Sequence, residues 1–280
     1  MILIADSGAT KTDWILGSSI SDAYSFRTRG LNLALSSKSD IDELFFELSK
    51  WEDLVADEVK AIYFYSAGAI NGLSNDYFYF SAKSFFSSAK VFCDNDLLAA
   101  SRALFGTSAG LVAILGTGSN SAYYDGEKIV KNIRPGGFIL GDEGSAASLG
   151  KNFLSDFIKG LLPSAIQSDL ETIYHLDYPT IVQKVYKEAN PSRFLGSLAP
   201  YIYSLSDDEC VDKLIRKNLT DFVERVLLQY DKSLDIGVVG SFGAASKSYL
   251  SDLGRDYGLN FVKFLSSPIE ALLDYHLKNV

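Results

Sequence analysis

The residues best suited to chemistry in this sequence lie where apolar runs end in acidic, glycine-containing turns. Asp6 follows the apolar residues 2–5 and opens the turn Asp-Ser-Gly-Ala-Thr-Lys. Such a turn offers backbone amides to phosphate oxygens, a glycine for close approach and a carboxylate suited to Mg²⁺. Lys11 has two interpretations, because it could neutralise phosphate or pair at the surface with Asp13. The pattern predicts phosphate binding, with Asp6 at the metal and these candidates at the phosphates: Gly8, Ala9, Thr10 and Lys11.

The same arrangement occurs a second time in the chain. An apolar run ends at Leu115 and leads into Gly-Thr-Gly-Ser-Asn, and a shift of 110 residues places Ile4 on Ile114 and Gly8 on Gly118. Such an internal duplication predicts two related halves that present matching turns to one ligand. The second turn adds three phosphate candidates, Thr117, Gly118 and Ser119.

Carboxylates are the expected acid–base groups. The chain has only two histidines, His175 and His276, and its two cysteines lack the spacing of a zinc or iron–sulfur site. Asp96 stands where a short strand gives way to an Ala-rich helix, and the helix N-terminus is expected to keep its carboxylate ionised and accessible. The alternatives are that Asp96 is a helix cap, or that the reactive carboxylate is Asp94.

The composition is that of an ordinary globular protein. Its 280 residues carry a net charge of −9, which makes nucleic acid a poor partner. The longest apolar runs are shorter than the roughly 18 residues that a membrane span needs, and no secretory signal is visible, so we expect a cytoplasmic protein without membrane contact.

Periodicity places these residues on a coarse framework. The apolar runs at 2–5 and 13–16 predict a hairpin, and a helix capped by Ser39 is expected to follow. A third glycine turn follows the apolar residues 235–239 and begins a helix. Two adjacent acids, Asp142 and Glu143, precede another predicted helix, and capping would account for one of them.

Six segments in order resemble the BadF/BadG/BcrA/BcrD ATPase family, and within it the N-acetylglucosamine kinase-like members. They are "ADSGATKTDW", "DND", "GTGSNSAYYDG", "PGGFILGDEGSAASLG", "VVGSFG" and "SSPIEALLDY". The resemblance implies two ribonuclease-H-like domains of the actin-like ATPase fold, with the nucleotide in an interdomain cleft. The expected boundaries are 1–106 and 107–267, and the helix at 268–280 is expected to return to the first domain.

The resemblance also implies roles for particular residues. Asp96 would be the general base toward a sugar hydroxyl, and Asp6 would position Mg²⁺, although it could be only a turn former. The sugar-binding candidates are Asn32, Gly136, Gly137, Asp142 and Glu143, of which Asn32 could be an ordinary loop residue. The adenosine candidates are Gly240, Phe242 and Gly243, of which Phe242 could belong to the core.

The function expected from these residues is transfer of the γ-phosphate of ATP, with Mg²⁺, to a hydroxyl of an amino sugar. N-acetylglucosamine is the first candidate, followed by glucosamine and N-acetylmuramate. One alternative is an ATPase activator of 2-hydroxyacyl-CoA dehydratases, which needs bridging cysteines that Cys93 and Cys210 do not provide. Another is a non-catalytic nucleotide-binding module. The sequence leaves the oligomeric state open, with a homodimer as one option.

Overall fold

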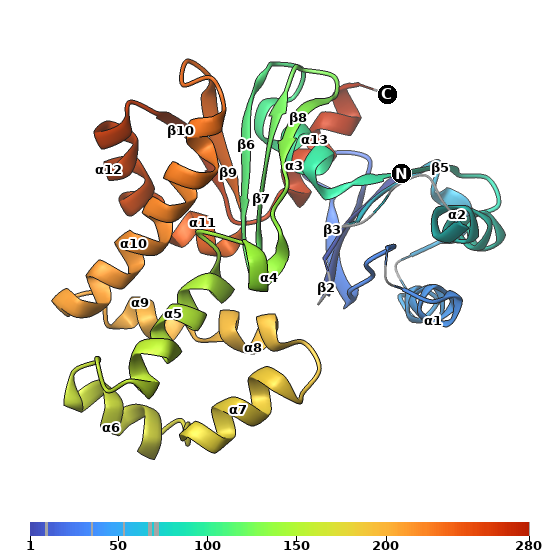
Figure 1. Ribbon diagram of the computed structural model, residues 1–280. Helices are drawn as coiled ribbons and strands as arrows, with labels where there is room; N and C mark the ends of the chain where they lie inside the picture. The colour runs from blue at the N-terminus through green and yellow to red at the C-terminus, as the bar shows by residue number, and fades with distance from the viewer. Residues whose placement is uncertain (9–10, 35, 53, 67–68, 70–72, 280) are drawn as a thin grey trace. The chain divides into compact units, whose positions relative to one another are not determined.

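The computed structural model describes residues 1–8, 11–34, 36–52, 54–66, 69 and 73–279, and the chain forms two compact units (Figure 1). Unit 1 comprises residues 1–108, 125–129 and 267–280, and unit 2 comprises residues 109–124 and 130–266. Each unit contains one five-stranded sheet with helices packed against it.

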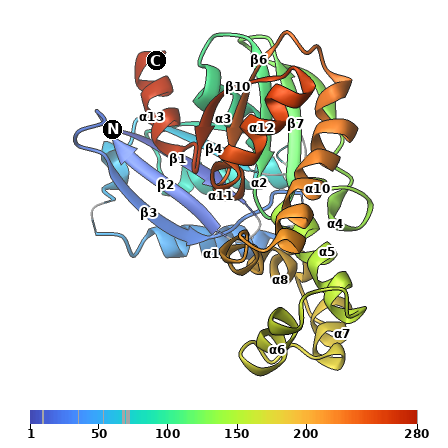
Figure 2. The same ribbon diagram turned by 90° about the vertical axis from the view of Figure 1, so that its left-hand side faces the viewer.

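The sheet of unit 1 has the strand order β3-β2-β1-β4-β5. Strand β1 pairs antiparallel with β2 and parallel with β4, and β4 pairs parallel with β5. Figure 2 shows β1, β2 and β3 side by side. The strands are β1 (Ile2–Ser7), β2 (Lys11–Gly17), β3 (Tyr24–Arg29), β4 (Ala61–Ser66) and β5 (Lys90–Asn95). The helices are α1 (Lys38–Leu48), the short η1 (Ala56–Glu58), α2 (Leu73–Phe85), α3 (Asp96–Phe105) and α13 (Ile269–Lys278).

The hairpin predicted at the N-terminus is present, because β1 and β2 pair with Ser7 opposite Thr12. The predicted cap of α1 is wrong by two residues. Ser37 caps this helix in a capping box with Asp40, and Ser39 lies inside the first turn. Ser37 is the better N-cap than Ser39, because the residue three positions after it, Asp40, has a carboxylate that accepts a hydrogen bond from the Ser37 amide.

Helix α13 is distant in sequence from the rest of unit 1 but packs against α3, β1 and β2. Its buried residues include Leu272, Leu273 and His276. The core of the unit is formed by large buried side chains, among them Trp14, Phe64 and Phe78. Asp6 lies near the carboxyl end of β1, and Asp96 directly follows β5. Both strands therefore belong to a sheet whose core is filled by large buried side chains.

The sheet of unit 2 has the order β10-β9-β6-β7-β8. Strand β6 pairs antiparallel with β7 and parallel with β9, and β9 pairs parallel with β10. The strands are β6 (Gly110–Leu115), β7 (Ser119–Tyr124), β8 (Ile129–Ile133), β9 (Asp235–Val239) and β10 (Asn260–Leu265). When the strands are counted from the first in each unit, both sheets have the order 3-2-1-4-5, which is the duplication predicted from the repeated turn.

The helices of unit 2 are more numerous and lie mostly between β8 and β9 in the chain. They are α4 (Gly137–Leu140), α5 (Ala146–Ile158), α6 (Ser164–Thr172), α7 (Tyr178–Tyr186), α8 (Pro191–Ser197), α9 (Ala199–Ser204), α10 (Glu209–Arg225), the short η2 (Leu227–Gln229), α11 (Ser241–Ala245) and α12 (Lys247–Tyr257). Helices α5 and α8 pack closely, since a Cβ at Gly150 would meet the Leu195 carbonyl. Within the described part of the chain, no helix has the length and apolar character needed to cross a bilayer.

Candidate active site

Two carboxylates of unit 1 lie at the carboxyl ends of parallel strands. Asp6 is the last but one residue of β1, and Asp96 directly follows β5 as the first residue of α3. Burial, together with the nearby charges of Asp96 and Asp13, raises the pKa of Asp6 to about 7. A buried carboxylate whose charge is destabilised by a second carboxylate is suited to a bound cation.

Asp96 is half-buried, and Asn95 rather than Asp96 caps α3, because the Asn95 side chain accepts the Leu98 amide at 2.9 Å. The Leu97 amide donates to Oδ1 of Asp96 at 2.9 Å. Burial raises the pKa of Asp96 despite these amide contacts. The expected ionising effect of the helix N-terminus is therefore outweighed by loss of solvent, which makes the carboxylate a stronger base.

Asp94 has a different environment from Asp96. Its Oδ2 lies 3.6 Å from NH1 of Arg102, which belongs to the next turns of α3. The same Arg102 atom donates to the hydroxyl of Tyr65 at 2.7 Å. Asp94 therefore takes part in a polar network with its own cation, whereas burial and backbone amides are what act on the pKa of Asp96 among the described residues.

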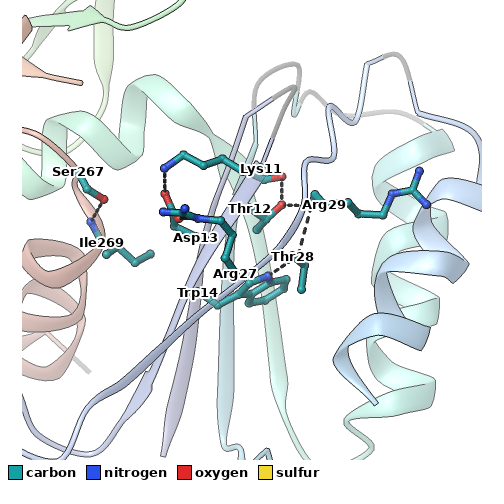
Figure 3. Close-up of polar contacts among 10 residues, drawn as sticks. Lys11, Thr12, Asp13, Trp14, Arg27, Thr28, Arg29, Ser267 and Ile269 are labelled. Carbon is teal, nitrogen blue, oxygen red and sulfur yellow. Dashed lines mark hydrogen bonds and ion pairs between the residues drawn. The ribbon is translucent and has the colours of Figure 1, made fainter. Parts of the chain in front are cut away.

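The described residues beside the first glycine turn bond within the hairpin, and Figure 3 shows Lys11 in contact with Asp13. The Gly8 amide donates to the Lys11 carbonyl at 3.0 Å, so this amide is not available to a phosphate. Lys11 pairs with Asp13 at 2.6 Å, and Arg27 contacts the other oxygen of Asp13 at 2.6 Å. Lys11 thus follows the surface-pair interpretation. Ala9 and Thr10 lie outside the described residues.

The loop that carries Asn32 is fixed by hydroxyl groups at the ends of β1 and β4. Ser7 donates to the Leu31 carbonyl at 2.9 Å and accepts the Leu31 amide at 3.0 Å. Ser66 also donates to the Leu31 carbonyl, at 2.6 Å. The side-chain oxygen of Asn32 accepts the Ala34 amide at 3.0 Å. The side-chain oxygen of Asn32 is therefore used within the turn.

The second glycine turn, in unit 2, is braced by the start of α5. The amides of Ala146 and Ala147 donate to the carbonyls of Gly116 and Thr117, both at 3.0 Å. The Thr117 side chain is exposed, and Ser119 is buried at the start of β7. The positive end of the α5 dipole thus lies directly behind the turn, which favours an anion there.

Asp142 lies against this turn. A Cβ added to Gly118 would meet Oδ2 of Asp142 at 2.9 Å, and the Ser119 amide donates to the same carboxylate. Asp142 is buried and has a positive φ of 54°. Burial raises its pKa, and the Ser119 amide opposes the shift. The segment "GDEG" therefore contacts the "GTGS" turn through the Asp142 carboxylate.

Glu143 is held elsewhere, because its Oε1 lies 2.7 Å from NH1 of Arg225 in α10. Neither acid caps α5. That role belongs to Ser145, whose hydroxyl accepts the Ser148 amide at 3.1 Å, so the capping role expected of the acids is wrong. A hydroxyl two or three residues later in the chain was better placed for the N-cap geometry.

The third glycine turn lies beside the second, since β9 and β6 are parallel neighbours. Gly240 has a φ of 121°, and a Cβ there would come within 2.2 Å of the Leu115 carbonyl. Phe242 is buried in the core and packs edge-on against Tyr203. Gly243 is required by packing, because its Cβ would meet Val238 at 2.5 Å. Only Gly240 among the three borders the candidate turn.

Gly136 and Gly137 both have left-handed backbone conformations, with φ of 76° and 72°. A Cβ on Gly137 would meet nothing within 4 Å, whereas one on Gly136 would lie 3.2 Å from the Leu140 backbone. The Asp142 amide donates to the Pro135 carbonyl at 2.8 Å, which closes this loop. The open space at Gly137 is compatible with a substrate close to the backbone.

Comparison with solved structures gives the family. A Porphyromonas gingivalis protein described as "Putative N-acetylglucosamine Kinase" is 35% identical to this chain, with 100% of this chain and 99% of that chain covered and a TM-score of 0.94. The chain belongs to the same family as that protein. No protein-family model and no curated protein matches the chain, so membership of the BadF/BadG/BcrA/BcrD family stays a prediction.

Two more distant structures share the fold of this family member. A "Putative N-acetylglucosamine Kinase" from Chromobacterium violaceum is 20% identical, with 98% and 99% of the two chains covered and a TM-score of 0.72. A ROK family glucokinase from Streptomyces griseus, solved with glucose and AMPPNP, is 12% identical with 98% of each chain covered and a TM-score of 0.61. The predicted fold class, α/β with two units of the actin-like ATPase type, is confirmed.

Several residues that shape the site were not predicted from the sequence. Ser7 and Ser66 fix the Asn32 loop, and Arg225 holds Glu143. The only sequence signal for the serines was their place at the ends of two apolar strands. Arg225 is far from Glu143 in the chain and had no signal apart from its position on a long amphipathic helix.

Proposed function

We propose that this protein is an ATP-dependent sugar kinase that transfers the γ-phosphate to a hydroxyl of an amino sugar, with N-acetylglucosamine as the first candidate. The observation that carries the proposal is the placement of Asp96, a half-buried carboxylate of raised pKa at the start of α3. The family relationship at 35% identity over the whole chain supports the reaction class.

In the proposed reaction, Asp96 is the general base. Its Oδ1 accepts the Leu97 amide, so Oδ2 is assigned to the substrate hydroxyl. The hydroxyl oxygen forms a bond to the γ-phosphorus as the bond from that phosphorus to the bridging oxygen of ADP breaks, and the hydroxyl proton passes to Asp96. The products are a sugar phosphate and ADP.

Asp6 is the residue proposed to provide oxygen donors for Mg²⁺, while Asp96 serves as the base. Within the described residues, no group of three or more His, Cys, Asp or Glu side chains is arranged to hold a metal ion. A pair of nearby carboxylates still fits Mg²⁺, which usually keeps several waters and completes its shell with substrate phosphates. When bound, the ion would neutralise phosphate charge, and Asp6 is the residue assigned to it.

The remaining candidates are assigned by unit. In unit 1, Asn32 is proposed to donate to the sugar, and the turn from Gly8 to Lys11 is proposed to border the phosphates, with Lys11 released from Asp13. In unit 2, the phosphate candidates are Thr117, Gly118 and Ser119, and Gly240 borders them. Phe242 and Gly243 support that turn from the core side. Gly136, Gly137 and Asp142 are proposed to border the sugar.

The test is a coupled assay of ADP release with Mg²⁺-ATP and a panel of sugars: N-acetylglucosamine, glucosamine, N-acetylmuramate and glucose. ADP release that depends on an amino sugar and yields one phosphosugar per ADP is expected. ATP hydrolysis that no sugar accelerates would contradict the kinase proposal and favour the dehydratase-activator type. Nucleotide binding without turnover would favour a non-catalytic module.

A further inference from the structure

Three residues of α10 contact three consecutive residues of the loop that precedes α5. Asn218, Phe222 and Arg225 are spaced i, i+4 and i+7, so they share one face of the helix. They meet Ser145, Gly144 and Glu143, respectively, which places the loop antiparallel along this face. We call Asn218, Phe222 and Arg225 the α10 stripe.

The buried end of the stripe is Asn218. Its Nδ2 donates to the Ser145 carbonyl at 3.1 Å, and its Oδ1 finds no partner in the described part of the chain. Burying an unpaired amide oxygen costs stability, and a leucine would fill similar space without that cost. The donor bond to the N-cap residue of α5 is therefore the feature that an asparagine adds here.

The middle of the stripe fixes the approach of the backbone. Gly144 has a φ of 73°, and a Cβ there would lie 2.5 Å from Cβ of Phe222. Any other residue at position 144 would push the loop away from α10. The glycine and the phenylalanine together keep the loop backbone against the helix.

The exposed end is the ion pair between Arg225 and Glu143. The Glu143 side chain is 14% exposed and the Arg225 side chain 66% exposed, with 2.7 Å between NH1 and Oε1. Glu143 is adjacent to Asp142. The Asp142 carboxylate lies against Gly118 and accepts a hydrogen bond from the Ser119 amide. A shift of Glu143 is therefore transmitted through one peptide bond to the carboxylate against the glycine turn.

We infer that the α10 stripe positions the Asp142–Ser145 loop, with Arg225 as a positioning residue that acts through Glu143 on the substrate-binding carboxylate Asp142. This inference rests on the proposed sugar-kinase function and deepens it, because it assigns Asp142 to the substrate and Glu143 to the support. The competing interpretation is that Glu143 binds the sugar directly and that Arg225 only shields its charge.

A charge exchange separates these interpretations. The variants are Arg225→Glu, Glu143→Arg and the double variant that carries both. Arg216→Glu is the matched control, because Arg216 lies on the same helix and pairs at 3.0 Å with Asp256, away from the loop. The readouts are the sugar KM, the ATP KM, kcat and the melting temperature.

Arg225→Glu is expected to raise the sugar KM about tenfold. Loss of a partly exposed ion pair alone would raise the KM only a few-fold, and the new glutamate adds repulsion of Glu143 to that loss. The double variant is expected to return within about threefold of the parent, and Arg216→Glu is expected to leave the sugar KM unchanged. Kinetics of Arg225→Glu that match the parent would overturn the inference. So would a double variant as impaired as Glu143→Arg alone.

A second readout does not depend on activity. Hydrogen exchange of the loop amides at 142–145 should accelerate in Arg225→Glu and return toward the parent rate in the double variant. If the parent shows no sugar-dependent turnover, the proposed function fails and this exchange pattern still decides the inference. Equal exchange in all variants would show that the stripe does not hold the loop.

Discussion

The hydroxyl of Tyr65 hydrogen-bonds Nε2 of His276, with 2.7 Å between the two atoms. The same hydroxyl accepts a hydrogen bond from NH1 of Arg102 at 2.7 Å. The His276 ring also stacks on Tyr63, with centroids 3.6 Å apart. A neutral histidine thus joins α13 to β4 and α3 inside unit 1.

This arrangement predicts that acid destabilises unit 1. Burial, followed by the charge of Arg102, lowers the pKa of His276 to about 3. Because an unfolded histidine titrates near 6.5, the unfolded chain binds more protons between these values, and the free energy of unfolding falls as the pH decreases. We expect the contribution of His276 to stability to fall by on the order of 1–3 kcal/mol between pH 7 and pH 4, seen as the difference between the parent and His276→Gln. Urea unfolding at several pH values measures it.

The control for this prediction is the second histidine. His175 is exposed, so His175→Gln should keep the acid-dependent loss, whereas His276→Gln should remove most of it. Glutamine retains an acceptor for the Tyr65 hydroxyl. Identical pH slopes in the parent and in His276→Gln would show that the loss comes from other groups.

Asp96→Asn tests the proposed base. Asparagine keeps the size and the contact with the Leu97 amide but cannot take a proton at neutral pH. Sugar-dependent turnover is expected to fall by about 10²- to 10⁴-fold, with the affinity for ATP nearly unchanged. The measurements are kcat from the coupled assay and nucleotide affinity from calorimetry.

Asp94→Asn is the matched comparison, because Asp94 is the other carboxylate at the end of β5. Its loss leaves Arg102 bound to Tyr65, so we expect a modest loss of stability and largely retained turnover. If Asp94→Asn abolished turnover and Asp96→Asn did not, Asp94 would be the base. If both variants stayed active, phosphoryl transfer would rest on positioning and electrostatics alone.

The strands that lead into the three glycine turns could be predicted because each of these apolar runs carries its own local signal. The pairing of the "GTGS" turn with Asp142 could not be predicted, because it depends on a loop closed by the Pro135 carbonyl and on the left-handed conformation of Asp142. The contacts of the α10 stripe could not be predicted either. Glu143 and Arg225 are separated in the chain by α5 to α9 and most of α10, and no spacing rule covers such a contact.

Helix caps show the same limit on a smaller scale. Ser37 and Ser39 are chemically equal candidates, and the backbone position that suits a cap is decided by Asp40. The position of Asp96 between a strand and a helix was within reach of sequence reasoning, since it needs only a strand end and a helix start. Its raised pKa was not, because burial by surrounding elements outweighs the local helix effect.

The glycine of the second turn provides a third prediction. Gly118→Ala would place a Cβ 2.9 Å from Oδ2 of Asp142, so the carboxylate must move. Gly116→Ala is the control in the same turn, because a Cβ there meets nothing within 4 Å. We expect Gly118→Ala to weaken binding of an ATP analogue several-fold more than Gly116→Ala does, with both variants folded. Calorimetric titration measures it, and equal, parent-like affinities would remove this turn from the site.

A fourth prediction concerns two aspartates that face each other across the β1–β2 pair, Asp6 and Asp13. Burial and the charge of Asp96 raise the pKa of Asp6 to about 7. Burial also acts on Asp13, but hydrogen bonds from Lys11 and Arg27 outweigh it and lower the pKa of Asp13. The same substitution to asparagine should therefore have opposite effects on stability at the two positions.

For Asp6, the native state binds the extra proton between pH 4 and pH 7, so its contribution to stability falls as the pH rises through 7. Asp6→Asn should raise the free energy of unfolding of the metal-free protein by about 1–3 kcal/mol at pH 8 and by little near pH 4. For Asp13, the stabilising contribution of the carboxylate is present above the unfolded pKa and is lost as the pH falls, so Asp13→Asn should destabilise the protein at pH 8. Urea unfolding in EDTA measures the stability of both variants.

Sugar-dependent turnover should fall in Asp6→Asn although its fold is more stable. The reason is that a carboxylate at the proposed metal position is retained at a cost to stability. A destabilised Asp6→Asn at pH 8 would mean that the ionised Asp6 carboxylate supports the fold and would remove this argument for a cation at Asp6.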